Sequence, residues 1–150
     1  MPSIPQFSAT VFATDTVAVR DFYVDLFDLD VSSDVGWFTS LRRGDAPWEV
    51  CVWDPGHESV PAAVRASAAG AAPLLAFVVD GAEAVDAVVR AARQRGAEVI
   101  ADAVDEPWGQ RHAFVRDPAG TVVDVVAFIA PDPAWLAANG IDPEAVPAGS

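Results

Sequence analysis

An internal repeat constrains this chain more than any other feature of its sequence. Residues 7–13, "FSATVFA", have the pattern of a strand and precede "TDTVAVRDFYVDLFDLD". Residues 73–79, "PLLAFVV", have the same pattern and precede "DGAEAVDAVVRAARQRG". A shift of 65 residues superposes the two segments and places Asp15 on Asp80 and Asp21 on Asp86. A chain of 150 residues with this repeat is predicted to form one domain from two similar halves.

Each half continues from its strand into an amphipathic helix. Apolar residues recur at the i, i+3, i+4 and i+7 spacing that defines one face of a helix. They are Val19, Phe22, Tyr23 and Leu26 in the first helix, and Val85, Val88, Val89 and Ala92 in the second. We expect Thr14 or Asp15 to cap the first helix. Asp80 is the expected N-cap of the second helix, and Gly96 is its expected stop.

Three further strands are predicted after each helix. They cover about 30–34, 36–43 and 47–54 in the first half, and about 97–101, 111–117 and 121–129 in the second. The order β-α-β-β-β therefore occurs twice, in modules 7–54 and 73–129, and the fold class is α+β. Residues 55–72 are expected to form a linker that contains one helical turn. Within the tail 130–150, a short helix is expected at 132–140, with Asp132 as its cap.

Charge and composition exclude several kinds of partner. The net charge is −13, with nine arginines and no lysine, which argues against nucleic acid and anionic membranes and favours a cationic small molecule. The longest apolar run, 66–79, is interrupted and too short to span a membrane. A single cysteine, Cys51, excludes an intrachain disulfide, and the N-terminus has no signal-peptide pattern. We therefore expect a cytoplasmic protein.

Strand alternation assigns side chains to faces of the sheet. One face of the first strand carries Ser8, Thr10 and Phe12, and one face of the strand "PWEVCVWD" carries Glu49, Cys51 and Trp53. The segment "DPAG" (117–120) is a tight-turn pattern. If Asp117 pairs with Gly120, then Ala113 lies opposite Asp124, and Arg111 lies diagonally from Asp124 on the same face.

That register would let Arg111 form an ion pair with Asp124 and would turn His112 toward the helix. Glu49 and Asp124 then have three open roles: general acid and base, binding of a cationic ligand group, or simple pairing with Arg111, Arg42 or Arg43.

The five tryptophans suggest an aromatic ligand cavity. Trp53 and Phe12 are expected to line it, together with Trp37 and Trp108. Flat aromatic walls beside acids suit stacking of a planar or cationic ligand. Trp48 is expected in the core, Trp135 is expected to pack the last helix, and Cys51 is expected to be a buried, unreactive thiol.

The chain resembles the vicinal oxygen chelate superfamily in its paired modules and in two segments, "ATDTVAVRDFYVDLFDLDV" and "PWGQRHAFVRDPAGTVVDVV". That group contains glyoxalase I, extradiol dioxygenases, fosfomycin-resistance transferases and bleomycin-resistance proteins. The resemblance implies a cupped mixed sheet built from two βαβββ modules, with a ligand cavity between the cups. It also implies a homodimer, and the linker would allow modules to be exchanged between chains.

The resemblance also implies four positions at which family metalloenzymes hold a divalent metal, usually with His or Gln, then Glu, His and Glu. They fall on Ser8, Glu49, Leu74 and Asp124. Two carboxylates without an imidazole make a poor permanent site for Zn, Ni or Fe, although they could hold Mg or Ca weakly. No cofactor is therefore expected.

Two functions from different classes follow. The first is a metal-independent binding protein of the bleomycin-resistance type, which sequesters an aromatic or cationic small molecule, for example an antibiotic. The alternative is a glyoxalase-like lyase or isomerase, or a dioxygenase-type enzyme, that uses a divalent metal. A partner-binding or regulatory domain with a vestigial pocket is a third reading of the same sequence.

Overall fold

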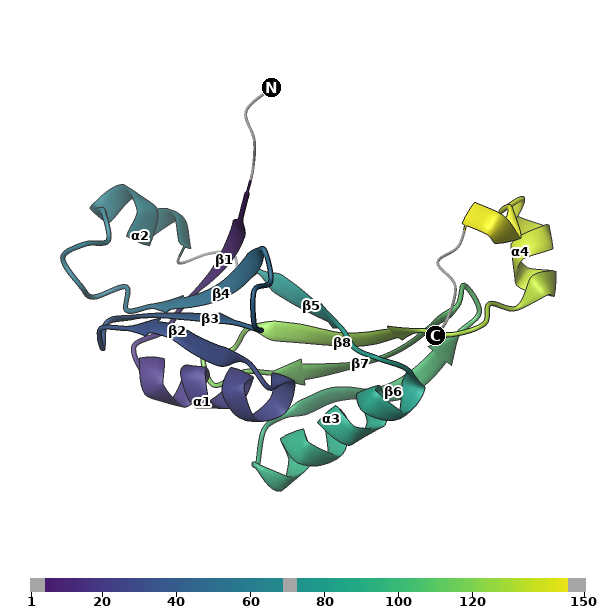
Figure 1. Ribbon diagram of the computed structural model, residues 1–150, viewed down its shortest axis with the longest axis horizontal. Helices are drawn as coiled ribbons and strands as arrows, with labels where there is room; N and C mark the ends of the chain where they lie inside the picture. Colours follow the sequence, from purple (N-terminus) through teal and green to yellow (C-terminus); the bar gives the residue numbers. More distant parts are fainter. Residues whose placement is uncertain (1–4, 69–72, 146–150) are drawn as a thin grey trace. The chain divides into compact units, whose positions relative to one another are not determined.

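The computed structural model describes residues 5–68 and 73–145 (Figure 1). The end of the expected linker, 69–72, and the end of the tail, 146–150, lie outside the described residues. The first half contains β1 (Phe7–Phe12), α1 (Thr16–Phe27), β2 (Asp30–Asp34), β3 (Phe38–Arg42), β4 (Trp48–Trp53) and α2 (Ala62–Ala68). The second contains β5 (Leu74–Val78), α3 (Ala82–Gln94), β6 (Val99–Glu106), β7 (Gln110–Arg116), β8 (Val122–Phe128), α4 (Pro133–Asn139) and a 3-10 turn (Pro143–Ala145).

The predicted α+β fold of two βαβββ modules is confirmed. The strand orders are β1-β4-β3-β2 and β5-β8-β7-β6, with the first pair of each sheet parallel and the others antiparallel. Each sheet is therefore mixed, and its first strand reaches its neighbour only after the helix has crossed over. The linker segment holds α2, and β6 extends five residues beyond the expected end at residue 101.

The chain divides into two compact units. The first comprises Met1–Pro73 together with the turn Asp117–Thr121, and the second comprises Leu74–Arg116 and Val122–Ser150. Within the first unit α1 packs on β3 and β4, and within the second α3 packs on β6, β7 and β8. In each unit one face of the sheet is thus covered by a helix, and the opposite face is called here the open face (Figure 1).

The predicted helix faces form the two cores. Val19, Phe22, Tyr23 and Leu26 are all buried under the first sheet, and Val85, Val89 and Ala92 are buried under the second. Asp15 caps α1 by accepting a hydrogen bond from the Ala18 amide at 2.9 Å. Asp132 caps α4 in the same way through Ala134.

The shift of 65 residues is wrong by one. Gly81, and not Asp80, is the N-cap of α3, and it makes no side-chain cap bond. Matching the two caps, Asp15 and Gly81, gives a shift of 66, which also aligns the ends of β1 and β5. Ser8 then corresponds to Leu74.

A buried carboxylate shapes the turn between β7 and β8. Asp117 is 3% exposed, and its Oδ1 accepts hydrogen bonds from the amides of Ala119 and Thr121 at 2.9 and 2.8 Å. Its Oδ2 accepts from the hydroxyl of Tyr23 at 2.8 Å. The Asp117 amide bonds to the Thr121 carbonyl, so that 118–120 is a three-residue loop with Gly120 at φ 90°. A type I turn followed by such a glycine is a common hairpin connection.

Within the described residues, no helix is long and apolar enough to cross a membrane.

Tyr23 gives a direct test of this buried pair, since it is the only tyrosine in the chain. Burial, helped by the charge of Asp117, raises the pKa of Tyr23 above its ordinary value of about 10. Tyr23 should therefore favour the folded state below pH 10, and this contribution should fall as the pH rises further, because only the unfolded chain then loses the proton. In an alkaline titration, tyrosinate absorbance should appear together with loss of tryptophan ellipticity.

The matched variant is Tyr23→Phe, which leaves Asp117 without its hydroxyl donor. It should lower the free energy of unfolding by about 1–3 kcal/mol in urea at pH 7. Tyrosinate formation near pH 10 in the folded wild-type protein would contradict the burial of this hydroxyl.

Candidate functional site

The open face of the first unit brings together six of the predicted site residues. In the parallel pair β1–β4, Ser8 lies opposite Glu49, Thr10 opposite Cys51, and Phe12 opposite Trp53. The alternate residues Val11, Val50 and Val52 are buried on the helix side. The antiparallel neighbour β3 adds Phe38 beside Trp53 and Ser40 beside Cys51. This arrangement follows from side-chain alternation once the strands are in register.

Three aromatic rings cluster at one end of this face. The rings of Phe12 and Trp53 are stacked, with centroids 6.0 Å apart and planes at 23°. Phe38 meets Trp53 edge-on at 5.8 Å and 89°. Both geometries suit the ring quadrupole. Phe38 was not among the predicted site residues, although side-chain alternation along β3, with Leu41 buried on the helix side, places it here.

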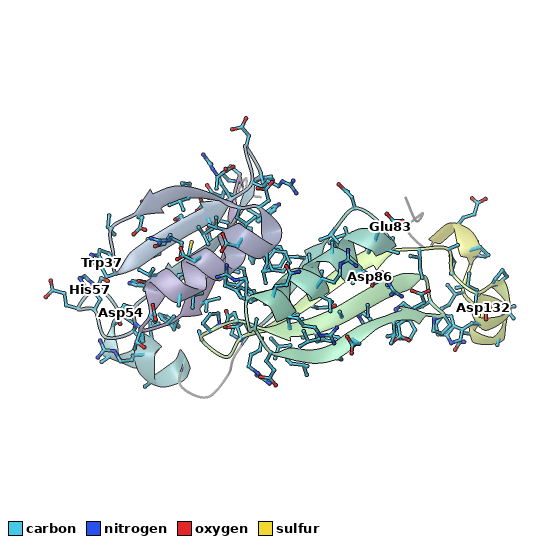
Figure 2. All side chains as sticks on the ribbon, turned by 90° about the horizontal axis from the view of Figure 1, so that it is seen from below. Trp37, Asp54, His57, Glu83, Asp86 and Asp132 are labelled. Atoms are coloured by element: carbon cyan, nitrogen blue, oxygen red, sulfur yellow. The ribbon has the colours of Figure 1, made fainter. Side chains whose placement is uncertain are left out.

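Trp37 is linked to this cluster through the loop after β4. Its ring stacks on His57, with centroids 4.0 Å apart and planes at 3°, and the two labelled side chains lie together in Figure 2. The His57 Nδ1 lies 2.8 Å from the Ser59 hydroxyl, which accepts a hydrogen bond from Trp53 Nε1 at 3.0 Å. Trp48 is 36% exposed, so its predicted place in the core is wrong.

Polar groups continue this face beyond the aromatic cluster. The Ser32 hydroxyl donates a hydrogen bond to Glu49 Oε1 at 3.4 Å. Cys51 is 4% exposed, and its Sγ lies 3.8 Å from the Ser40 hydroxyl. Burial raises the pKa of the Cys51 thiol, so the protonated form is favoured at neutral pH. Along this face the aromatic rings are thus followed by an unreactive thiol and then by a carboxylate.

In the second unit the predicted register of β7 and β8 is wrong by one residue. Asp124 lies opposite Phe114, and Arg111 lies opposite Ala127. The reason is the three-residue loop 118–120, in which Gly120 belongs to the turn and Thr121 pairs with Asp117. A shift of one residue transfers every side chain of a strand to the other face.

Arg111 therefore lies on the helix side of the sheet and does not pair with Asp124. Its guanidinium donates to Asp86 of α3 at 2.8 Å and to Asp105 of β6 at 2.7 Å. His112, which was expected on the helix side, lies instead on the open face with Asp124.

A carboxylate, an imidazole and a second carboxylate form a line across this open face. His112 Nε2 lies 3.2 Å from Glu106 Oε1, and His112 Nδ1 lies 3.4 Å from Asp124 Oδ1. The second pair is close enough for an ion pair, but its geometry makes no hydrogen bond, so both atoms remain buried without one. Burial raises the pKa of Asp124, and the nearby His112 opposes this increase in part. The arrangement can hold or pass a proton, or bind a polar ligand group.

Trp108 borders this line of groups. It is 38% exposed, and its Nε1 donates to Gln110 Oε1 at 2.9 Å. Its ring centroid lies 6.4 Å from that of His112 and 5.9 Å from that of Trp135 on α4. Neither His112 nor Glu106 was among the predicted site residues, and the length of the turn after β7 is the feature that places His112 beside Asp124.

The residues at the family's metal positions do not fit a transition-metal centre. Ser8 and Glu49 are neighbours, but Leu74 lies beside Val122, while Asp124 lies beside Ala76. With the shift of 66, Asp124 therefore corresponds to Cys51 and not to Glu49. Leu74 offers no donor atom, and Cys51 on one open face and His112 on the other do not together form the set of nitrogen and sulfur ligands that Zn, Ni or Fe prefer. Across residues 5–68 and 73–145, no three His, Cys, Asp or Glu side chains gather as a metal-binding group.

Comparison with known proteins identifies the family. Residues 5–125 match the Glyoxalase/Bleomycin resistance protein/Dioxygenase superfamily, and the chain belongs to it. A search of curated proteins gave no match.

Solved structures show the same fold. A glyoxalase/bleomycin resistance protein/dioxygenase family enzyme from Burkholderia phytofirmans PsJN is 25% identical, with TM-score 0.68, over 83% of this chain and 98% of that one. Lactoylglutathione lyase from Agrobacterium tumefaciens is 23% identical, with TM-score 0.65, over 83% and 94%. TioX from Micromonospora sp. ML1 is 21% identical, with TM-score 0.62, over 81% and 96%.

The single thiol provides a test of the first open face. Cys51 should react with a disulfide reagent at pH 8 at least about tenfold more slowly in the folded protein than in urea, because burial limits access and disfavours the thiolate. Absorbance of the released thiol gives the rate. Equal rates in both conditions would show that Cys51 is accessible.

Asp124 provides a test of the second open face. Because its pKa is raised in the folded state, its ionisation opposes folding above that pKa, and this penalty is absent below the ordinary aspartate value near 3.9. Asp124→Asn should therefore raise the free energy of unfolding at pH 7, and the gain should shrink toward pH 4. Urea unfolding of both proteins at the two pH values measures it. A variant that is less stable at pH 7 would contradict the unfavourable burial of this charge.

Proposed function

We propose that this chain is a small-molecule binding protein of the glyoxalase/bleomycin-resistance type that holds an aromatic, cationic ligand without using a metal. The observation that carries this proposal is the cluster of Phe12, Phe38 and Trp53 on the same open face as the Glu49 carboxylate. The half-buried rings offer stacking area, and the carboxylate further along the same face favours a positively charged group.

The distribution of charge supports a cation over an anion. Within the described residues, the side chains placed on the two open faces include the carboxylates Glu49, Glu106 and Asp124. Arg111, which could have neutralised Asp124, is held on the opposite face by Asp86 and Asp105. The net charge of −13 adds a long-range attraction for cations. Planar basic antibiotics are one class of compound with this chemistry.

The metal-independent form of the proposal rests on the donor atoms. Leu74 cannot coordinate a metal, Ser8 offers only a hydroxyl, and the two carboxylates do not occupy equivalent positions in the two modules. A ligand held by stacking and ion pairing needs none of these groups to act as a metal ligand.

A second function is favoured by the line Glu106–His112–Asp124. An imidazole between two carboxylates, with a tryptophan beside it, can accept and return a proton during isomerisation or elimination in a bound substrate. This lyase or isomerase reading predicts that His112→Gln abolishes turnover but leaves ligand affinity nearly unchanged. The binding reading predicts no turnover in either protein.

The charge requirement can be tested with a matched pair of ligands, N-methylacridinium and neutral acridine at pH 8. The protein should bind the cation more tightly, and Glu49→Gln should lower its affinity by about tenfold while leaving that of acridine unchanged, since a charge contact near an aromatic face is lost. Trp53→Leu should weaken both ligands. Quenching of tryptophan fluorescence and calorimetry measure the affinities.

Glu83→Gln on α3 is the control, because it removes the same charge from an exposed helix position. Metal content of the purified protein is measured alongside. Equal affinity for the two acridines would refute recognition of a cation, and one tightly held metal per chain would refute the metal-free reading.

A further inference from the structure

The second unit contains a cavity on the helix side of its sheet, away from the open face. Its volume is about 250 Å³, and it is lined by Asp86, Arg90, Arg93, Asp102, Ala103 and Arg111, with Val89 below. Arg111 and His112 are consecutive on β7, so their side chains point to opposite faces. The cavity is therefore separate from the line Glu106–His112–Asp124. Figure 2 shows Asp86 on α3, the helix that forms one wall.

The cavity lies between a β-bulge in β6 and a row of charged side chains on α3. Ala101 pairs with Phe114 and Val104 pairs with His112, so β6 has one residue more than β7 between these pairs. The extra residue lies at Asp102–Ala103, and such bulges redirect side chains and often accompany binding sites. On α3, Asp86, Arg90 and Arg93 follow the i, i+4, i+7 spacing of a single face. That row lies beside the buried face of Val85, Val89 and Ala92 and brings two guanidinium groups to the wall of the cavity.

The arginines of the cavity differ in whether they have an acidic partner. Arg111 is held by Asp86 and Asp105, and Arg93 by Asp102 at 2.5 Å. The Arg90 side chain is exposed, and its guanidinium makes no hydrogen bond or ion pair with any residue in the described ranges. Three of the nine arginines in the chain thus line one small cavity, and the carboxylates of Asp86, Asp102 and Asp105 are already paired with two of them.

We propose that this cavity binds a small molecule through an oxyanion group, either a carboxylate or a phosphate, with Arg90 as the guanidinium that receives it. Arg93 and Arg111 are fixed by their acidic partners and supply positive charge without a further loss of side-chain freedom. Asp86, Asp102 and Asp105 are all engaged by Arg93 and Arg111, so Arg90 is the guanidinium of the lining left without a carboxylate, and an oxyanion would supply that partner. The volume is below the range of about 300–1,000 Å³ typical of drug-sized ligands, so the ligand is small.

This inference does not depend on the proposed function, since it concerns the other face of the sheet and the opposite ligand charge. It predicts a second site whose affinity is unchanged by Glu49→Gln or Trp53→Leu, the variants that weaken binding at the first open face.

The test is a titration of the ¹⁵N-labelled full chain with inorganic phosphate and, separately, with acetate, each at constant ionic strength against sodium chloride. Amide signals of α3 and β6, including Val89 and Ala103, should shift and saturate with at least one of the two anions. The anion that saturates identifies the source of the oxyanion. Arg90→Gln should weaken this binding by about tenfold or more, since a charge-assisted hydrogen bond is lost.

Two matched controls keep the result specific. Arg43→Gln removes the same charge from an exposed position in the first unit and should leave the affinity unchanged. Ala103→Leu fills the cavity and should abolish binding, whereas Ala87→Leu adds the same atoms at an exposed position of α3 outside the lining and should not. No saturable shift with either anion, or equal affinity in wild type and Arg90→Gln, would overturn the proposal.

Discussion

Which side chains of β7 and β8 lie on the same face of the sheet depends on one buried carboxylate, that of Asp117. Asp117 is 3% exposed, and both of its carboxylate oxygens accept hydrogen bonds, one from Tyr23 and the other from the amides of Ala119 and Thr121. These bonds compensate for burying the charge. These bonds fix a three-residue loop, the loop fixes the register of β7 and β8, and the register decides which side chains share a face. A loop shorter by one residue would have placed Arg111, and not His112, beside Asp124.

This dependence explains how much the sequence could predict. Helix faces such as that of Val19 and Tyr23 follow from a period of 3.6, which tolerates an error of one residue at a boundary. The first open face was also predictable, because β1 and β4 each alternate cleanly between apolar and polar positions. On β7 and β8 the alternation is weaker, and "DPAGT" allows closure at Gly120 or at Thr121. Because side chains alternate with a period of 2, an error of one residue in the register predicts the wrong face of the sheet for both Arg111 and His112. The N-cap of α3 shows the same sensitivity, since the shift of 65 instead of 66 misplaced it by one residue at Gly81.

The two modules keep one fold but carry different chemistry at equivalent positions. With the shift of 66, Ser8 corresponds to Leu74, and Cys51 corresponds to Asp124. The first open face therefore joins aromatic rings to a single carboxylate, whereas the second places a histidine between two acids. Membership of the superfamily fixes the strand order and the helix-covered faces. It does not fix the groups on the open faces, which differ between the two modules of this chain.

The placement of Arg111 gives the strongest physical reason to expect a cation at the second open face. An arginine beside Asp124 would have satisfied the acid within the protein and left little for a ligand to gain. Asp86 and Asp105 hold that arginine on the other side, so the raised pKa of Asp124 is countered only by His112, through a contact that makes no hydrogen bond. A positively charged donor that reaches Asp124 Oδ1 would satisfy a buried acceptor and a buried charge together. The same two acids hold Arg111 at the cavity beside α3, which Arg90 and Arg93 also line. One choice of register thus decides which charged groups each side of the sheet presents.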